Sequence, residues 1–392
     1  MARVAERAGS VEGVRRRNLS TLLRLVHLHG PSSRARLTEL TGLNRSTVAA
    51  LAAELVELGL VQERAPEGTN RVGRPSPVVA VDPRVLALAV NPEVDAVTIA
   101  AVRLGGGVAL RERIESTDLV SPEQTAELTL RTLQRWRAGA LRGSRLVGVG
   151  LAVPGLVRAS DGLVRMAPHL GWRDAPVRDL VATATGLPTA VGNDASLGAT
   201  AEHLFGAGRG VADLVYLNGG ASGIGGGLVV AGIPVAGAGG YAGEFGQNRP
   251  GIADPDDRRA DNGVLEDEVS RARLLAAVGL RSADEPTLAE AIATAASPEV
   301  HAEVDRQRRI LATALANAVN VLNPSLVVLG GFLATIAERD LAELRAAVVA
   351  QVMAAATEDL QLRVAALGED RLMIGAAEAA FGELLADPLR ER

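Results

Sequence analysis

Two groups of polar side chains have types and spacing that could do chemistry, and the first is the run Asn44-Arg45-Ser46-Thr47. This run opens an amphipathic segment directly after a Gly42-Leu43 turn. Guanidinium, amide and hydroxyl groups on the first turn of such a helix are the groups with which proteins contact DNA bases and phosphates. Asn44 is also a residue type that caps helix N-termini, so we expect it to cap this helix whether or not it touches a phosphate.

Two further cations, Arg71 and Arg74, lie in a loop rich in Gly, Pro and Arg between strand-like runs over 60–63 and 78–81. An arginine beside Gly and Pro at an exposed loop tip is well placed to reach a phosphate or the minor groove. The alternative is that the loop is a solvated hairpin tip. The pattern therefore predicts a DNA contact and leaves a purely structural loop open.

The second group is the pair Asn193-Asp194, which stands between a strand-like run over 187–192 and a helical pattern over 196–205. An amide and a carboxylate at the mouth of a cleft make paired, charge-assisted hydrogen bonds to vicinal hydroxyl groups. The alternative is that the pair caps the helix that follows.

The first group needs a scaffold, and residues 1–82 are predicted to form a winged helix-turn-helix domain. Leucine and valine recur at helical spacing over 14–29, and helices over 33–41 and 44–58 flank the glycine turn. Three helices followed by a two-stranded wing are typical of DNA-binding domains. This segment holds 12 arginines against 8 acidic residues, whereas the remainder holds 29 against 38. A basic module on an acidic body is typical of a polyanion-binding domain joined to a ligand-binding one.

The second group needs a different scaffold, and from residue 86 strands and glycine turns alternate with helices. We expect a three-strand meander over 86–114, then alternating helices and strands, and a second strand set after 210. This order predicts an α/β body with two lobes and a cleft between them. We assign residues 83–205 plus 372–392 to the first lobe, and residues 206–371 to the second lobe, which we expect to oligomerise.

The composition excludes several kinds of catalytic and metal-binding site. The 392 residues include no cysteine, which excludes disulfides, thiol catalysis and cysteine zinc sites. All 41 basic residues counted as Lys or Arg are arginines, so no Schiff-base lysine or phosphate-loop lysine exists. The opening 13 residues are charged and do not read as a signal peptide. No apolar run approaches membrane length, so we expect a cytoplasmic protein without membrane contacts.

Four segments of the body carry a family resemblance when taken together and in order: GNDASLGATAEHLFGAGRG at 192–210, GIGGGLVVAGIPVAGAGGYAGEFG at 223–246, GVLE at 263–266 and LNPSLVVLGG at 322–331. They resemble the ROK family of repressors and sugar kinases (repressor, open reading frame, kinase). The winged helix ahead of them resembles the repressor branch of that family. The resemblance covers the chain from about Leu19 to Leu385.

This resemblance implies a fold, an assembly and a sugar site. The implied fold is a two-lobed, actin-like or ribonuclease H-like body that closes on a sugar, and the implied assembly is a homodimer or a dimer of dimers. In kinase members the residue at the position of Asp194 is the catalytic base, and glycine at the position of Gly155 lets backbone approach the ring. Carried over by position, the sugar-binding residues would be Gly155, Asn193, Asp194, Glu244, Gln247 and Glu266.

Three departures from the family pattern bear on catalysis and on metal binding. The phosphate turn of kinase members is replaced by AVNPEV at 89–94, where Pro92 removes an N–H donor and Glu93 would repel phosphate. The cysteine-rich zinc loop is replaced by ADPDDRRADNGVLE at 253–266, and Gln247 stands where the family has a zinc-binding histidine. We therefore expect no zinc, no ATP and no other cofactor.

These observations lead to one preferred reading of function and leave two others open. The preferred reading is a sugar-responsive transcriptional regulator of the repressor type. We expect it to bind a palindromic stretch of double-stranded operator DNA as a homo-oligomer and not to be an enzyme. A sugar kinase that retains a DNA-binding domain is the first alternative. A DNA-binding protein whose body only oligomerises is the second.

Overall fold

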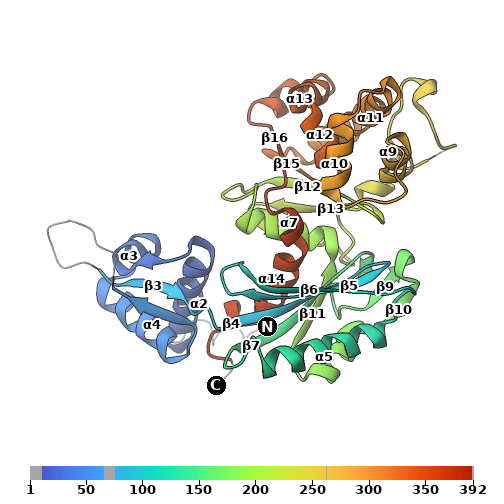
Figure 1. Cartoon of the computed structure of the whole chain (residues 1–392). Helices are drawn as coiled ribbons and strands as arrows, with labels where there is room; N and C mark the ends of the chain where they lie inside the picture. The colour runs from blue at the N-terminus through green and yellow to red at the C-terminus, as the bar shows by residue number, and fades with distance from the viewer. Residues whose placement is uncertain (1–10, 66–75, 262, 391–392) are drawn as a thin grey trace. The chain divides into compact units, whose positions relative to one another are not determined.

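The computed structural model describes residues 11–65, 76–261 and 263–390. The chain separates into two compact units, shown as ribbons in Figure 1. Unit 1 comprises Met1–Leu151, Pro176–Val191 and Ala376–Arg392, and unit 2 comprises Ala152–Ala175 and Gly192–Gly375. No helix among the described residues is both long enough and apolar enough to cross a membrane.

The N-terminal part of unit 1 is a winged helix, as predicted. Its elements are α2 (Val11–His29), β1 (Ser32–Ser33), α3 (Arg34–Thr41), α4 (Arg45–Glu57), β2 (Val61–Arg64) and β3 (Val78–Val81). The strands form an antiparallel sheet in the order β1-β3-β2. Helix α3 ends at Gly42, whose φ of 67° is the left-handed conformation that glycine adopts without strain. The predicted wing-tip residues Arg71 and Arg74 lie outside the described residues.

The rest of unit 1 is built on a five-stranded mixed sheet. Its elements are β4 (Val85–Pro92), β5 (Ala96–Arg103), β6 (Val108–Glu115), α5 (Pro122–Ala138), β7 (Arg145–Val153), α6 (Val177–Thr185), β11 (Thr189–Asn193) and α14 (Arg371–Ala386), the last residues of β7 and β11 and the first residues of α14 belonging to unit 2. The strand order is β11-β7-β4-β5-β6, and β4, β5 and β6 form the predicted antiparallel meander.

Within unit 1, one buried histidine joins the winged helix to the rest of the unit by two hydrogen bonds. The His27 side chain on α2 is only 2% exposed, and its Nδ1 accepts a hydrogen bond from the Gly105 N–H at 2.8 Å. Because Nδ1 accepts, Nε2 carries the proton and donates it to Glu378 Oε2 on α14 at 3.1 Å. Two further bonds join α2 to the end of α14. Ser20 Oγ donates to the Leu385 carbonyl at 2.6 Å, and Arg16 pairs at 2.9 Å with Asp387, the residue that follows α14.

Unit 2 contains the second five-stranded sheet, in the order β14-β13-β12-β15-β16. Its helices and strands are α7 (Asp194–Phe205), β12 (Leu214–Gly220), β13 (Gly223–Val230), β14 (Ile233–Pro234), α8 (Leu265–Glu268), α9 (Arg271–Ala277), α10 (Glu285–Thr294), α11 (Pro298–Leu322), β15 (Leu326–Gly331), α12 (Phe332–Arg339), α13 (Leu341–Val349) and β16 (Gln361–Val364). Five short 3₁₀ turns, η1 to η5, connect them at Pro168–Leu170, Phe245–Gln247, Pro255–Asp257, Ala354–Thr357 and Gly368–Asp370.

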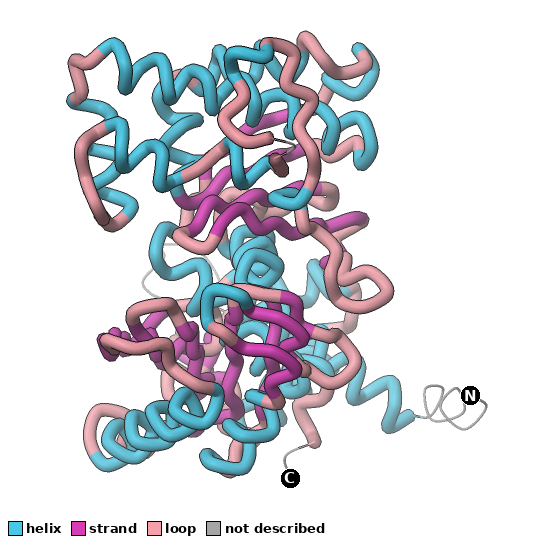
Figure 2. The backbone as a smooth tube through the Cα atoms, turned by 90° about the vertical axis from the view of Figure 1, so that its right-hand side faces the viewer, coloured by secondary structure: helices cyan, strands magenta, loops and turns pink. Residues whose placement is uncertain are grey.

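Both faces of this sheet are covered by other elements. Alternate side chains along a strand point to opposite faces, so neighbouring residues of one strand enter different clusters. Val215 and Leu217 of β12 join the core cluster formed with α9 to α13, whereas Leu214 and Tyr216 join a second cluster with Ala199 of α7. Figure 2 shows the helices of unit 2 (cyan) together with these strands (magenta). The strand set expected after residue 210 is present and includes the β12–β13 hairpin, and α7, which packs on this sheet, carries Asp194 at its first position.

A small three-stranded antiparallel sheet completes unit 2. It consists of β8 (Leu156–Val157), β9 (Val164–Ala167) and β10 (Trp172–Ala175), in the order β10-β9-β8. The sequence patterns did not predict these strands, and they did not predict α8, α9, α10, α12, α13 or β16. The fold class is confirmed: a winged helix precedes an α/β body with two mixed sheets, as in actin-like sugar kinases.

Candidate functional site

A pocket of about 440 Å³ lies in unit 2 and gathers most of the polar residues singled out in the sequence. Small-molecule sites commonly measure roughly 300–1,000 Å³. All of its lining residues belong to unit 2, and they come from the Pro154 turn, the small sheet, the start of α7, the β12–β13 hairpin, η2 and α8. The six residues expected to bind sugar all line it: Gly155, Asn193, Asp194, Glu244, Gln247 and Glu266.

Asn193 has a structural role at this pocket. Its Oδ1 accepts the Ser196 N–H at 2.9 Å and so caps α7, and its Nδ2 donates to the Gly155 carbonyl at 3.1 Å. The capping alternative considered from the sequence is therefore present. The same side chain ties the Pro154-Gly155 turn to the start of α7, and one proton of its amide stays available for a ligand.

Gly155 is required by close packing. A Cβ atom at this position would lie 2.3 Å from the Met166 carbonyl oxygen and 2.8 Å from the Ala167 Cα. Glycine is therefore needed for the turn to approach strand β9, which brings Met166 to the pocket wall. Approach to a ligand ring, which the family resemblance implied, is not needed to explain this residue.

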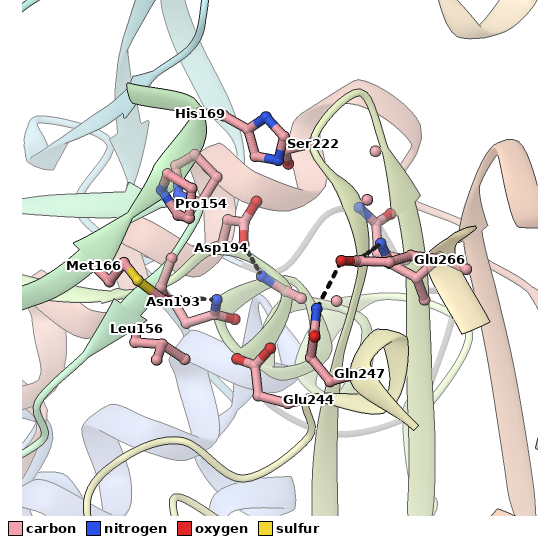
Figure 3. Close-up of a pocket in the computed structure, with 18 residues that line it drawn as sticks. Pro154, Leu156, Met166, His169, Asn193, Asp194, Ser222, Glu244, Gln247 and Glu266 are labelled. Carbon is pink, nitrogen blue, oxygen red and sulfur yellow. Dashed lines mark hydrogen bonds between the residues drawn. The ribbon is translucent and has the colours of Figure 1, made fainter. Parts of the chain in front are cut away.

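Two acidic side chains have free oxygens at the pocket, as Figure 3 shows. Asp194 Oδ1 accepts the Ala195 N–H at 2.8 Å. Burial raises the pKa of Asp194 to about 6, an effect that this backbone N–H and the charge of Arg371 partly offset. Burial, and then the nearby charge of Glu266, raises the pKa of Glu244 above its ordinary value. Two carboxyl groups with raised pKa values in one pocket mark a candidate binding or catalytic site.

Glu266 and Gln247 form a hydrogen-bonded pair at the other side of the pocket (Figure 3). The Gln247 amide donates to Glu266 Oε1 at 2.6 Å, and the Ile224 N–H donates to Glu266 Oε2 at 3.1 Å. The carboxylate is thus oriented by β13 and η2 before any ligand binds. Gln247 uses its amide nitrogen here as a donor to a carboxylate.

Sequence reasoning missed several residues of the pocket wall, among them Met166, His169 and Ser222. Met166 and His169 arrive through the small sheet and η1, and Ser222 through the two-residue turn between β12 and β13. No short motif marks them, because only the folded small sheet and the β12–β13 turn bring them to the pocket. An apolar wall facing a rim of acids and amides is typical of sites for small polar molecules.

The segment at 89–94 comprises the end of strand β4 and the start of the tight turn that leads to β5. Asn91 and Pro92 end β4 opposite Thr98 and Val97 of β5. The Glu93 N–H donates to the Ala96 carbonyl at 2.7 Å, and the Glu93 carboxylate accepts from Thr98 Oγ1 at 2.8 Å.

Arg113 of β6 places a positive charge beside the carboxylates of this turn. It pairs with Asp95 at 2.8 Å and lies 3.7 Å from Glu93. The turn therefore presents carboxylates and an occupied N–H group, which do not suit a phosphate.

The candidate nucleic-acid surface is the start of α4. Asn44 caps the helix through the Thr47 N–H at 2.8 Å, as predicted, and Ser46 Oγ donates to Asn44 Oδ1 at 2.7 Å. Arg45 is exposed, and its guanidinium pairs with no acid among the described residues. By contrast, Arg15 pairs with Glu54 at 2.6 Å, so its charge is used inside the domain.

Comparison with known proteins places these features in a family. The model of the ROK family matches residues 89–382. The chain is 26% identical over 373 residues to the xylose repressor of Caldicellulosiruptor bescii, which covers 91% of this chain and 93% of that protein. It is 30% identical over 262 residues to a glucokinase of Halalkalibacterium halodurans, which covers 59% of this chain and 75% of that protein.

A solved structure extends the likeness to the whole chain. It is described as a ROK family transcriptional regulator, a homologue of the E. coli MLC protein, and it superposes with a TM-score of 0.75 at 23% identity, covering 96% of this chain and 98% of that one. At this identity the likeness shows the fold, winged helix included. The match to the repressor covers 91% of this chain, whereas the match to the glucokinase covers 59% of it. The chain therefore belongs to the ROK family, in the branch that carries an N-terminal winged helix-turn-helix.

Proposed function

We propose that this chain is a sugar-responsive transcriptional regulator that binds palindromic operator DNA as a homo-oligomer in the cytoplasm. In this proposal residues 1–82 bind DNA, residues 83–205 with 372–392 form the first lobe, and residues 206–371 form the second. The observation that carries the proposal is the presence, in one chain, of an exposed recognition-helix start at Asn44–Thr47 and a polar pocket around Asp194.

The pocket chemistry supports a carbohydrate as the effector. Asp194 and Glu244 offer free carboxylate oxygens, and Asn193 offers an amide proton, so vicinal hydroxyls would find charge-assisted acceptors and a donor. Met166 and Leu156 supply the apolar wall that a sugar ring contacts with its C–H face. Since the relatives matched over nearly the full length include a xylose repressor, D-xylose is the first sugar to test.

The turn at 89–94 argues against a kinase. Phosphoryl transfer depends mainly on positioning the phosphates and stabilising their charge. Glu93 and Asp95 place negative charge in the turn that would have to do this, and the Glu93 N–H is already bonded. We therefore propose that Asp194 serves in sugar recognition and that the chain does not catalyse phosphoryl transfer.

Regulation would follow from linkage. A sugar that binds one arrangement of the body more tightly than another shifts the protein toward it, and the same arrangement sets the spacing of two winged helices in a dimer. That spacing either matches or misses two half-sites about one helical turn apart, or a multiple of it. Binding of sugar and of DNA would then alter each other by the same factor.

The proposal is tested in two stages. First, thermal unfolding is recorded with D-xylose, D-glucose and other monosaccharides, since a ligand at about 100 times its Kd adds roughly 2.7 kcal/mol to stability. Second, binding to the DNA upstream of the chain's own gene and to random DNA is compared by fluorescence anisotropy, with and without the active sugar. Equal affinity for both DNAs refutes a regulator, and sugar-dependent ATP consumption would favour the kinase alternative.

A further inference from the structure

The loop that precedes Glu266 is held in place by a buried arginine. This loop, of which the structure describes residues 254–261 and 263–264, leads into α8, a helix of four residues that carries Glu266 and Glu268. The family resemblance implies a zinc-binding loop at this position, and zinc needs three or four side-chain donors. The chain has no cysteine, Gln247 has its amide on Glu266, and the described residues contain no group of three His, Asp or Glu side chains that could hold a metal. The residues present do not fit zinc.

Arg306 of α11 occupies the centre of this region. Its side chain is 2% exposed, and all five of its N–H groups donate hydrogen bonds. Nε and Nη2 donate to the Glu303 carboxylate at 2.9 and 2.8 Å. Nη1 donates to the Asp257 carbonyl at 2.8 Å and to Glu268 Oε2 at 3.1 Å, and Nη2 also donates to the Glu268 carbonyl at 2.8 Å. A planar guanidinium with every donor used fixes each of its partners in direction as well as in distance.

Glu268 extends this arrangement to the loop backbone. Its carboxylate is 1% exposed and accepts the N–H groups of Arg259 and Ala260 at 3.0 Å. Beside it, Arg309 makes two hydrogen bonds to the Asp257 carboxylate, at 2.7 and 3.1 Å. The loop is thus tied to α11 at Asp257, at Arg259-Ala260 and at the end of α8.

These contacts bear on the pocket because Glu266 and Glu268 share one helical turn. Fixing Glu268 fixes the backbone of Glu266, whose carboxylate then receives the Gln247 amide and the Ile224 N–H. A metal ion organises a loop by binding several of its side chains at one point, and a guanidinium with five donors does so without a metal.

We propose that the Arg306–Glu268 pair is a metal-free positioning centre that holds Glu266 ready for the effector. The part concerning the effector rests on the function proposed above. Arg306 and Glu268 are positioning residues: neither lines the pocket, and both act through Glu266. The centre makes the loop independent of zinc and makes effector affinity depend on an arginine outside the pocket.

The first test measures the loop without any sugar. Arg306→Met is compared with the parent by hydrogen–deuterium exchange of the full-length protein. We expect faster exchange in peptides from 254–268, with β15 and α12 unchanged. Arg308→Met is the matched control, since Arg308 lies on the same helix, is 9% exposed and pairs with Glu343 and Asp305 away from the loop. Equal exchange at 254–268 in both variants, or faster exchange throughout Arg306→Met alone, would overturn the proposal.

A second variant guards against misfolding, because removing one partner of a buried ion pair can destabilise the whole protein. Arg306→Lys keeps the charge but offers three donors instead of five. We expect its exchange at 254–268 to lie between those of the parent and of Arg306→Met. In the parent, EDTA should change neither the melting temperature nor this exchange, and elemental analysis should find less than 0.1 zinc per chain, taken as roughly the background for a protein without a tight site. Loop protection that is lost with EDTA overturns the centre.

A third measurement addresses the effector. With D-xylose, or whichever monosaccharide stabilises the parent, Arg306→Lys should bind about 10- to 100-fold more weakly, as happens when supporting partners of a ligand-binding group are removed. Arg308→Met should bind like the parent. If no sugar binds the parent, the proposed function fails while the exchange result still decides the positioning centre. If the parent, Arg306→Lys and Arg308→Met bind the sugar with equal affinity, Arg306 does not position Glu266.

Discussion

At the scale of single residues, Asp194 is a half-buried acid whose ionisation weakens the fold. Its pKa of about 6 lies above the ordinary value of 3.8, so the folded protein holds the proton more tightly than the unfolded chain. Its contribution to the free energy of unfolding is therefore greatest below about pH 4 and is lost as the pH rises through about 6. Residues kept despite such a penalty commonly serve binding or catalysis.

Asp194→Asn should raise the melting temperature at pH 7.5 and leave it nearly unchanged at pH 4. The amide keeps the size of the side chain and its bond to the Ala195 N–H but removes the buried charge. Calorimetry between pH 4 and pH 8 measures the effect. Asp179→Asn is the control, because that side chain is 69% exposed. A lower melting temperature at pH 7.5 would show that the Asp194 charge is satisfied in the folded protein.

The same substitution should weaken the binding of the effector sugar. Losing a charged acceptor costs roughly 1.5–3 kcal/mol of binding free energy. In the parent, binding should also weaken as the pH falls below about 6, because protonation removes the charge of Asp194. Titration calorimetry at pH 5, 6 and 7.5 tests both statements. Asp194→Asn should lose this pH dependence, and a variant that retains it would assign the dependence to Glu244.

At the scale of elements, helix α4, the proposed recognition helix, combines a side-chain cap with one exposed arginine. Asn44 fixes the first turn of α4, and Arg45 projects from that turn without an acidic partner among the described residues. Arg15 and Arg34 differ, because each makes two hydrogen bonds to a glutamate inside the winged helix. Arginine count alone therefore overstates the charge that this domain offers to DNA.

Arg45→Ala should weaken operator binding and reduce the dependence of the affinity on salt by about one released ion. If Arg45 reads a base, the loss should be about 1–3 kcal/mol and specific to one position of each half-site. Anisotropy titrations from 50 to 300 mM salt separate the two cases. Arg131→Ala on α5 is the control, since that residue is exposed in the body. An unchanged salt dependence would remove Arg45 from the interface.

Elements with strong local signals could be predicted from the sequence, and elements without them could not. The caps Ser33, Asn44 and Ser121 and the alternating strands of the meander act within a few residues, so their patterns are visible in the chain. The small sheet and α8 to α10 are short and are stabilised by contacts distant in sequence. Arg306 shows the limit most clearly, because Glu268 and Asp257 lie 38 and 49 residues away from it. In the pocket, Glu244 and Glu266 came from the family resemblance rather than from any local pattern.

At the scale of the whole molecule, the two ends of the chain belong to the same unit. Helix α2 near the N-terminus packs on α14 near the C-terminus through His27 and Glu378, with Ser20 and Arg16 bonded beyond them. Helix α14 itself begins at Arg371, whose charge lowers the pKa of Asp194. Within unit 1, the last turns of this helix therefore support the winged helix.

Glu378→Ala should lower the free energy of unfolding by about 1–3 kcal/mol, the usual penalty for leaving the buried His27 donor unbonded. It should also speed hydrogen exchange in α2 and reduce the effect of sugar on operator affinity, because α14 would hold the winged helix less firmly. Glu383→Ala is the control, since Glu383 is 62% exposed and pairs only with Arg390 at 3.1 Å. Unchanged coupling between sugar and DNA in Glu378→Ala would exclude α14 as the link.

The joining of the two chain ends also sets an order of events during synthesis. Helices α2 to α4 are synthesised long before Glu378, Leu385 and Asp387, the residues to which α2 bonds. At about 5–20 residues per second, the ribosome needs roughly 10–45 s to pass from Leu151, where the first segment of unit 1 ends, to Ala376, where its last segment begins. During that time α2 exposes the surface that α14 will cover. A chain that stopped before α14 would therefore lack the hydrogen bonds that Glu378 and Leu385 make to α2, and the winged helix would lose this support.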